Sequence, residues 1–244
     1  RDWDGRARKN AFHYIASWRK EWDIESFLAS GEDDIKQLVV PALTRCGLLL
    51  AGKRMLELGC GTGRMTHCFA RRFENVYALD LSCEMLSRAR QIHSGQHNIL
   101  WLRSNGADLA CVISDSMDFV FSYLVLQHLP EEAQTLQYVR EILRVLRPGG
   151  AFLFQFSDGF APTMNWRGRL AWGIVDALWS TRLGWLSSAA ASSLGLDPAA
   201  AGKSWRGASV AALTIAECVR SSGGQVREIS GENTPMAWCC GVKL

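Results

Sequence analysis

Residues 55–64 read MLELGCGTGR, and this stretch decides the fold. An apolar strand over 54–58 runs into three alternate glycines, Gly59, Gly61 and Gly63, and a helix is predicted over 65–73. Glycine permits positive φ and lets a ligand approach the backbone closely, and amides at a helix start can face a carboxylate. The spacing is G-x-G-x-G, which differs from the G-x-G-x-x-G dinucleotide fingerprint. Taken alone, the loop is either an ordinary turn or part of a ligand site.

Strands and helices alternate on both sides of this loop. Further apolar strands are predicted at 75–79, 98–102, 118–122 and 151–156, with helices at 83–92 and 131–146 and a Pro-Gly-Gly turn at 148–150. Continuous apolar strands separated by helices indicate a parallel sheet covered on both faces. A helix at 209–221 and strands at 225–230 and 236–242 follow, and the short link with Gly231 and Asn233 predicts an antiparallel hairpin at the sheet edge.

Two helical segments flank the alternating region. Residues 1–50 are predicted to form N-terminal helices. The first helix is predicted over 2–30, stops near Ser30-Gly31 and has an apolar face with Ala7, Ala11, Tyr14, Ile15 and Trp18. A second helix is predicted over 33–50, with a kink or break at Pro41.

Residues 159–206 are rich in Trp, Ala and Arg and contain no convincing strand. Trp172 and Trp179 are seven residues apart, so a helix would place both on one face. Trp172 and Trp179 could belong to a membrane-surface helix, to a dimer interface or simply to the packed core of this segment, and the sequence leaves these alternatives open.

Composition restricts the class of protein. The 244 residues are 48% hydrophobic with a net charge of +3 and no basic run, which predicts a single domain over 1–244 and no nucleic-acid partner. The eight cysteines form no C-x-x-C pair and no histidine lies at zinc spacing, so reduced thiols and no metal are expected. Nothing near Arg1 resembles a signal peptide and no apolar run reaches transmembrane length. We therefore expect a cytoplasmic protein without stable membrane insertion.

Polar residues at two further strand ends suggest a nucleoside site. Asp80 ends the second strand, where a carboxylate can accept hydrogen bonds from both hydroxyls of a ribose. The alternative is that Asp80 caps the helix that follows, with help from Ser82. Asn105 and Gly106 follow the third strand, where a polar side chain and a backbone amide could bind adenine; an ordinary Asn-Gly turn is the other interpretation.

Five runs together carry a family resemblance: MLELGCGTGR (55–64), VYALDLSCEML (76–86), SNGADL (104–109), DFVFSYLVLQHLP (118–130) and EILRVLRPGGAFLFQF (141–156). In order and spacing, the chain resembles class I S-adenosylmethionine-dependent methyltransferases of the small-molecule type 11 or 12. The resemblance implies a doubly wound, Rossmann-like α/β sheet of seven strands in the order 3-2-1-4-5-7-6, with strand 7 antiparallel.

The resemblance also implies roles for residues. Glu57 would orient the glycine loop and the methionine end of S-adenosyl-L-methionine, Asp80 would hold the ribose, and Leu81 would pack on the adenine. Asn105 stands where the family usually has aspartate, and its carbonyl oxygen can still accept a hydrogen bond. Further expected cofactor contacts are the three loop glycines, Arg64, Gly106 and Ser122. Inserts after the fifth strand usually cover the active site in this family, so the resemblance also implies that residues 159–206 form a helical cap insertion over an apolar or aromatic substrate.

Residues after the fourth strand are candidates for the chemistry of methyl transfer. His128 is the best candidate for a general base, because its ordinary pKa lies near neutrality, although packing at a helix start is equally compatible with its position. Tyr123 would line the methyl pocket or pack in the core. Tyr14, Gln127 and Arg206 are candidates for substrate binding.

Three functions are compatible with these features. The first is methyl transfer to an oxygen or nitrogen of a small-molecule acceptor, such as a natural product, sugar or lipid-like compound, with S-adenosyl-L-homocysteine as product. The second is a nicotinamide-dependent oxidoreductase, against which the glycine spacing and the terminal hairpin count. The third is a non-catalytic cofactor-binding interaction module. The oligomeric state is open, with a homodimer among the possibilities.

Overall fold

The computed structural model describes residues 2–159 and 207–244, together with a few scattered positions between 170 and 194. The strands are β1 (Gly52–Leu58), β2 (Phe73–Asp80), β3 (Ile99–Arg103), β4 (Met117–Ser122), β5 (Leu146–Phe156), β6 (Gly224–Ser230) and β7 (Ala237–Lys243). They form one sheet in the order β3-β2-β1-β4-β5-β7-β6, in which β7 pairs antiparallel with β5 and β6 and the other pairs are parallel. The predicted fold class and strand order are confirmed.

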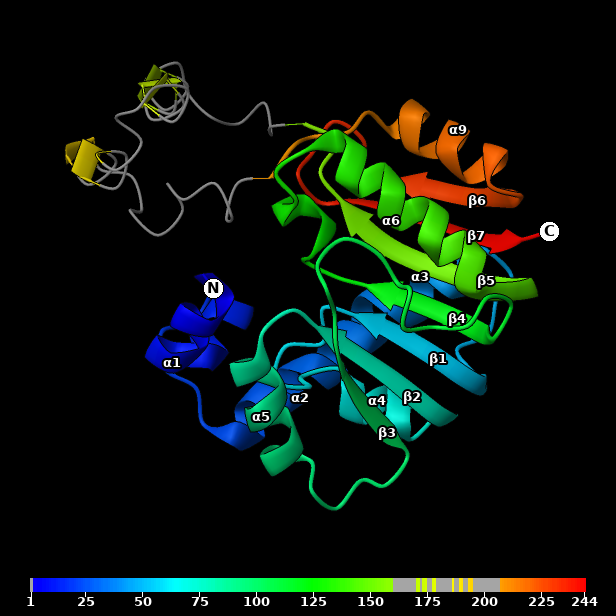
Figure 1. Ribbon diagram of the computed structural model, residues 1–244, viewed down its shortest axis with the longest axis horizontal. Coiled ribbons are helices and arrows are strands. Elements are labelled where there is room, and N and C mark those ends of the chain that lie inside the picture. Colours follow the sequence, from blue (N-terminus) through cyan, green and yellow to red (C-terminus); the bar gives the residue numbers. More distant parts are fainter. Residues whose placement is uncertain are drawn as a thin grey trace.

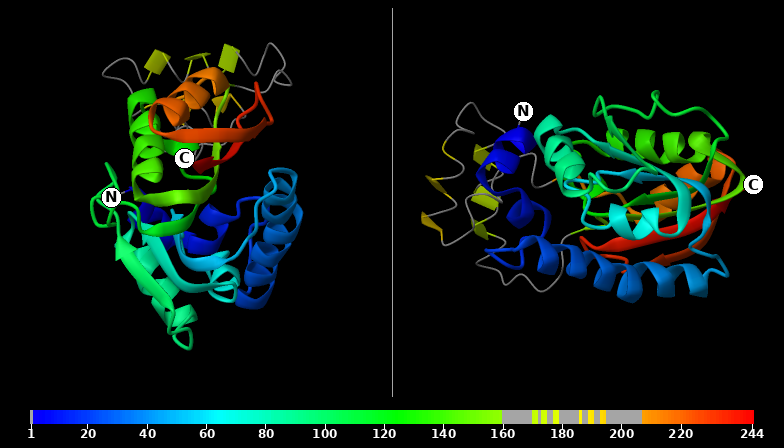
Figure 2. Two further views of the ribbon diagram at one scale, coloured as in Figure 1. Left: turned by 90° about the vertical axis from the view of Figure 1, so that its right-hand side faces the viewer. Right: turned by 90° about the horizontal axis from the view of Figure 1, so that it is seen from below.

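The helices are α1 (Asp2–Ile15), α2 (Ile24–Asp34), the π-helical η1 (Ile35–Val39), α3 (Val40–Arg45), α4 (Thr66–Ala70), α5 (Cys83–Ile92), the 3₁₀-helical η2 (Leu126–His128), α6 (Glu132–Val145) and α9 (Ala212–Ser221). The run α2–η1–α3 lies along one face of the sheet and α6 along the other (Figure 2). The α1 helix lies beyond the carboxyl ends of the parallel strands, whereas the C-terminus lies at the opposite edge (Figure 1).

Two clusters of buried side chains pack between the sheet and its helices, one on each face, because alternate side chains of each strand point to opposite faces. Leu56 of β1 packs with Val139 of α6 and Ile215 of α9 in the first cluster. Met55, the next residue back along β1, packs with Val39 of η1 and other side chains of the second cluster. The sheet is therefore covered by helices on both faces, as the continuous apolar strands predicted.

The prediction for the N-terminal helices was wrong at two places. The first helix ends at Ile15, and Trp18 lies beyond it with 59% of its surface exposed. The second begins after Asp23, whose carboxylate accepts a hydrogen bond from the Ser26 amide, and it runs through Gly31 without stopping. A Cβ at Gly31 would lie 2.0 Å from the Arg64 carbonyl oxygen. Gly31 therefore permits close packing of α2 on the loop after β1 and does not end a helix.

Two proline positions also differ from the prediction. Pro41 follows the π-helical turn η1 and sits in the first turn of α3, so the helical path continues to Arg45. A proline is tolerated there because a first-turn N–H has no intrahelical partner. Pro148 lies within β5, which begins at Leu146, and the β4–β5 register shifts between Met117 and Phe119. The expected Pro-Gly-Gly turn is thus an irregularity inside a longer strand.

Within the described ranges, the helices are all too short or too polar to cross a bilayer.

Candidate cofactor site at the carboxyl edge of the sheet

The glycine loop connects β1 to α4 with all three alternate glycines at positive φ. The φ angles are +78° at Gly59, +57° at Gly61 and +85° at Gly63. Non-glycine residues pay about 1–2 kcal/mol for this region, which explains the residue type at each position. The Leu79 carbonyl of β2 accepts hydrogen bonds from the amides of Gly59 (2.7 Å) and Cys60 (2.9 Å), so β2 holds the start of the loop.

Asp80 ties the loop to the end of β2. Its Oδ2 accepts a hydrogen bond from the Gly61 amide and its Oδ1 accepts one from the Ser82 amide, both at 2.8 Å. The helix cap of α5 is Ser82, whose Oγ accepts from the Met85 amide at 3.1 Å. Asp80 is therefore not the helix cap, and its carboxylate keeps lone pairs for a ligand at the strand end. Burial raises the pKa of Asp80, whereas the two amide hydrogen bonds lower it.

Glu57 is buried beneath the loop. Thr66 Oγ1 donates a hydrogen bond of 2.6 Å to Glu57 Oε2. Burial raises the pKa of Glu57 to about 8, with the nearby Asp80 carboxylate acting in the same direction. The Thr62 hydroxyl is also buried in the loop, and no described residue pairs with it. Sequence reasoning missed Thr62, because a threonine between glycines has no pattern of its own; a buried polar atom without a partner indicates a place for a ligand atom.

The residues after β3 form a tight turn. Asn105 Oδ1 accepts hydrogen bonds from the amides of Ala107 (2.8 Å) and Asp108 (3.0 Å), and its Nδ2 donates to Asp108 Oδ1 at 2.7 Å. In this conformation the side chain of Asn105 stabilises its own turn, which favours the turn interpretation over direct adenine contact. Gly106, at φ +79°, has Leu81 against it, and 42% of the Leu81 surface is exposed. Leu81 therefore presents an exposed apolar side chain directly after Asp80.

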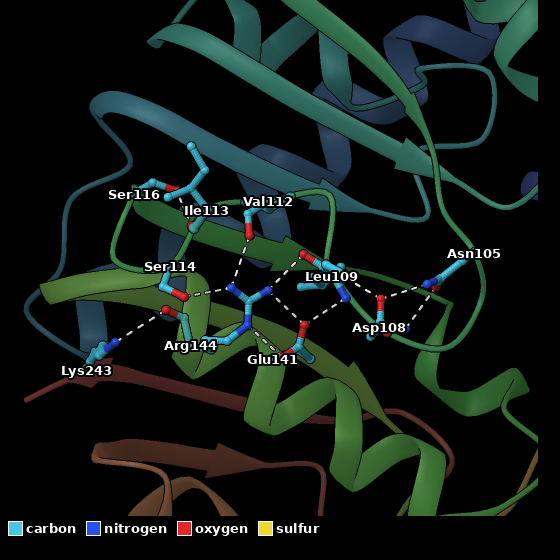
Figure 3. A network of polar contacts seen from close by, with 11 residues as sticks. Asn105, Asp108, Leu109, Val112, Ile113, Ser114, Ser116, Glu141, Arg144 and Lys243 are labelled. Atoms are coloured by element: carbon cyan, nitrogen blue, oxygen red, sulfur yellow. Dashed lines mark hydrogen bonds and ion pairs between the residues drawn. The ribbon is translucent and has the colours of Figure 1, made fainter.

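Arg144 of α6 fastens the whole segment between β3 and β4. Its guanidinium donates to the carbonyls of Leu109 (2.8 Å) and Val112 (3.1 Å), to Ser114 Oγ (2.8 Å) and to Glu141 (2.7 and 2.9 Å), as Figure 3 shows. Glu141 in turn accepts from the Leu109 amide at 2.9 Å. The turn that carries Asn105 is therefore anchored to a helix by charged hydrogen bonds, which are stronger than neutral ones.

The segment after β4 brings four predicted residues to the same edge. Ser122 is fully buried and donates to the Leu58 carbonyl at 3.3 Å. Tyr123 stacks on Trp238 with ring centroids 5.1 Å apart, and burial raises its pKa. Its position in an aromatic stack favours the packing interpretation. His128 lies at the end of η2, with its Nε2 3.3 Å from Gln127 Nε2.

Gln155 organises this segment and was missed in the sequence. Its Nε2 donates to Gln127 Oε1 (2.9 Å) and to the Pro235 carbonyl (2.7 Å), and its Oε1 accepts from the Leu124 amide (3.1 Å). Leu124 has a φ of +58°, a strained value for leucine. The sequence signal was a single glutamine in the otherwise apolar run AFLFQF. Gln155 is fully buried in the structure, and a buried polar side chain needs hydrogen-bond partners.

The α1 helix closes over this edge from the N-terminal side. Asp4 Oδ1 accepts hydrogen bonds from Ser82 Oγ (2.6 Å) and the Glu84 amide (3.1 Å) at the start of α5. The Trp3 ring meets His128 edge-on at 5.4 Å. At the other end of the helix, Ile15 packs closely on the glycine loop. A Cβ added to Gly61 would lie only 2.7 Å from Ile15 Cδ1. Tyr14 is half-buried beside Ile15.

Two predicted residues stand apart from this arrangement. The guanidinium of Arg64 is buried against α2, where it donates to Asp34 Oδ2 (2.6 Å) and Ser30 Oγ (3.2 Å), so it braces the loop from behind. Arg206 lies outside the described residues, as do the tryptophans of the predicted cap: Trp166, Trp172, Trp179 and Trp185.

Comparisons with known proteins agree with this geometry. Residues 56–154 match the model of the methyltransferase domain family. The resemblance noted in the sequence is thus confirmed.

Relatives of the methyltransferase domain include a malonyl-[acyl-carrier protein] O-methyltransferase of Salmonella typhimurium, 34% identical over 134 residues that cover 52% of this chain and 48% of that protein. A ubiquinone biosynthesis O-methyltransferase of Aeromonas salmonicida is 33% identical over 103 residues, 41% of this chain and 42% of that protein. The match therefore spans about half, or less, of the length of these curated relatives. Magnesium protoporphyrin IX methyltransferase from Synechocystis has a similar fold, with a TM-score of 0.57, 15% identity and coverage of 93% of this chain and 90% of that one.

Proposed function

We propose that the protein transfers a methyl group from S-adenosyl-L-methionine to a small-molecule acceptor. The observation that carries the proposal is the glycine loop held by Asp80, next to the buried Thr62 hydroxyl that no described residue engages. These residues fit the cofactor: Asp80 would accept from the ribose hydroxyls and Leu81 would pack on the adenine. Glu57 and Thr62 would face the methionine end.

The cofactor supplies a methyl group on a sulfonium, which is a good leaving centre, so the protein must mainly align the reactants and exclude water. Ile15 and Trp3 of α1 cover the carboxyl edge of the sheet and would keep water out. An acceptor that must lose a proton needs a base, and His128 is the candidate whose ring lies at this edge. Gln155 positions Gln127, the neighbour of His128, through a hydrogen bond of 2.9 Å.

The acceptor is proposed to be an oxygen or nitrogen nucleophile. The two curated relatives are named as O-methyltransferases of a malonyl group on a carrier protein and of ubiquinone biosynthesis. Both names favour an oxygen nucleophile over a nitrogen nucleophile as the acceptor. The oxidoreductase alternative is disfavoured by the antiparallel β7 and by the methyltransferase match.

Calorimetric titration with S-adenosyl-L-homocysteine tests the cofactor site. Wild-type protein should bind, and Asp80→Ala should lose binding, whereas Asp118→Ala, which removes a carboxylate from the far end of the sheet, should retain it. Absence of heat with wild-type protein would refute the proposal. Turnover is then measured with a panel of phenols, carboxylic acids and amines; binding without turnover of any acceptor would support the non-catalytic module instead.

A further inference from the structure

Three side chains of the types that bind transition metals converge where α2 meets α4. Glu32 comes from α2, and His67 and Cys68 come from α4. His67 Nε2 lies 3.6 Å from Glu32 Oε1 and 3.3 Å from Cys68 Sγ, and the three donor atoms all lie within 4.8 Å of one another. We propose that Glu32, His67 and Cys68 bind a divalent transition metal, with Zn²⁺ as the expected ion. This inference is independent of the proposed methyl transfer.

The distances agree with the geometry of a zinc site. Zinc binds imidazole nitrogen at about 2.0–2.1 Å and thiolate sulfur at about 2.3 Å in a tetrahedral arrangement, which places neighbouring donors roughly 3.3–3.6 Å apart. The nitrogen–sulfur and nitrogen–oxygen separations here are 3.3 and 3.6 Å. The third separation, between the sulfur and the carboxylate oxygen, is within 4.8 Å, so binding of an ion would draw these two atoms together by rotation of their side chains.

The chemistry of the donors selects the class of ion. A thiolate, an imidazole and a carboxylate suit zinc, whereas calcium and magnesium prefer oxygen donors alone. His67 is buried, and its Nε2 faces both Cys68 Sγ and Glu32 Oε1, so a ring nitrogen of the neutral imidazole could bind an ion held by all three side chains. Cys68 is also buried, and cysteine binds a metal as the thiolate, so the thiol proton leaves when the ion binds.

Arg71 shows that the cluster attracts a cation. Its Nη2 contacts Glu32 Oε1 and also lies 3.4 Å from Cys68 Sγ, so a positive nitrogen bridges two of the three donors. The Arg71 side chain is 55% exposed and can turn into solvent. A metal ion would have to replace this guanidinium, and removing the guanidinium should strengthen metal binding.

The cluster is connected to the glycine loop through stacked rings. His67 stacks on His93 at 5.9 Å between centroids, and His93 Nε2 lies 3.2 Å from the Thr62 carbonyl. Three protein donors leave one tetrahedral position for water, and Glu32, with 35% of its side chain exposed, opens the site to solvent. A bound ion would therefore join α2 to α4 directly behind the loop.

Titration with Co²⁺, followed by the thiolate-to-cobalt absorption band and the visible d–d bands, tests the site. Wild-type protein should bind one equivalent and release it to Zn²⁺. Cys68→Ser should lose the charge-transfer band and His67→Gln should weaken binding by about tenfold or more. Arg71→Gln should tighten binding by about threefold or more, because a competing charge is removed. Cys83→Ser, at an exposed cysteine away from the cluster, is the matched control and should leave the band unchanged.

Two results would overturn the proposal. One is no cobalt band in either wild-type protein or Arg71→Gln at millimolar Co²⁺; the other is a band that persists in Cys68→Ser. Circular dichroism verifies that each variant is folded. If Cys68→Ser does not fold, Glu32→Gln at the partly exposed position takes its place and should weaken binding about threefold or more; unchanged affinity in that variant also counts against the site.

Discussion

Gly63→Ala is expected to destabilise the fold more than alanine substitution at Gly47 or Gly95. Gly63 has a φ of +85°, and a Cβ there would lie 2.5 Å from His93 Nε2 and 2.8 Å from Trp101 Cη2. Both neighbours are rings in the stack that includes His67 and His93, and His93 is itself buried. Neither ring can turn away as the end of a flexible chain would.

The magnitude follows from two separate costs. A left-handed conformation costs a residue with a Cβ about 1–2 kcal/mol. Forcing an extra carbon into a packed site costs about 1–3 kcal/mol more. Gly63→Ala should therefore lower the free energy of unfolding by about 2–5 kcal/mol.

Two other glycines separate these costs. Gly47 has a φ of +67°, and a Cβ added there would have no atom within 4 Å. Gly47→Ala should therefore lower the free energy of unfolding only by the cost of the left-handed backbone conformation, about 1–2 kcal/mol. Gly95 has open space and no positive φ, so Gly95→Ala should change stability by less than about 0.5 kcal/mol.

Urea unfolding followed by tryptophan fluorescence measures all four proteins under the same conditions. The expected order of stability is wild type and Gly95→Ala, then Gly47→Ala, then Gly63→Ala. If Gly63→Ala were no less stable than Gly47→Ala, the argument that the His93 and Trp101 rings leave no room behind the loop would be refuted.

Three further perturbations test other parts of the structure. Gln155→Leu leaves buried groups such as the Leu124 amide without a hydrogen-bond partner and should lower the free energy of unfolding in urea by about 1–3 kcal/mol. Gln225→Leu, at an exposed position of the edge strand β6, should change it little. Arg144→Met should speed amide hydrogen exchange in residues 104–116, and unchanged exchange would show that the guanidinium does not anchor that segment. The raised pKa of Glu57, about 8, means that its contribution to stability is present below its ordinary pKa and is lost as pH rises toward 8. Between pH 6.5 and 8, wild-type stability should therefore fall relative to Glu57→Gln, and parallel curves for the two proteins would contradict a buried, protonated Glu57.

Much of the sheet could be predicted because its signals are local. Runs of apolar residues between helical segments give the strand positions, and positive φ favours glycine at the three alternate positions of the loop between β1 and α4. Asp80 was found for the same reason, because the end of a strand is visible in the sequence. The hairpin at residues 224–243 also followed from a short link between two strands.

Other features needed the packing of distant segments. Gly31 was taken for a helix end, although it is the place where α2 touches the Arg64 carbonyl. For Asn105 the sequence left both an adenine contact and an ordinary turn open, and the hydrogen bonds that its side-chain oxygen accepts from two amides of its own turn favour the turn. A sequence pattern shows which residue types are present, but not which hydrogen bonds they have already made.

The sequence by itself therefore determined the doubly wound sheet, the glycine loop after β1 and the carboxylate at the end of β2. The tertiary structure alone decided how α1 closes over the carboxyl edge, how Gln155 holds the segment before η2, and how Glu32 reaches His67 and Cys68. The physical reason is how far apart in the sequence the interacting residues lie. Backbone conformation and hydrophobic periodicity depend on near neighbours along the chain, whereas the convergence of side chains depends on how whole helices pack across the sheet.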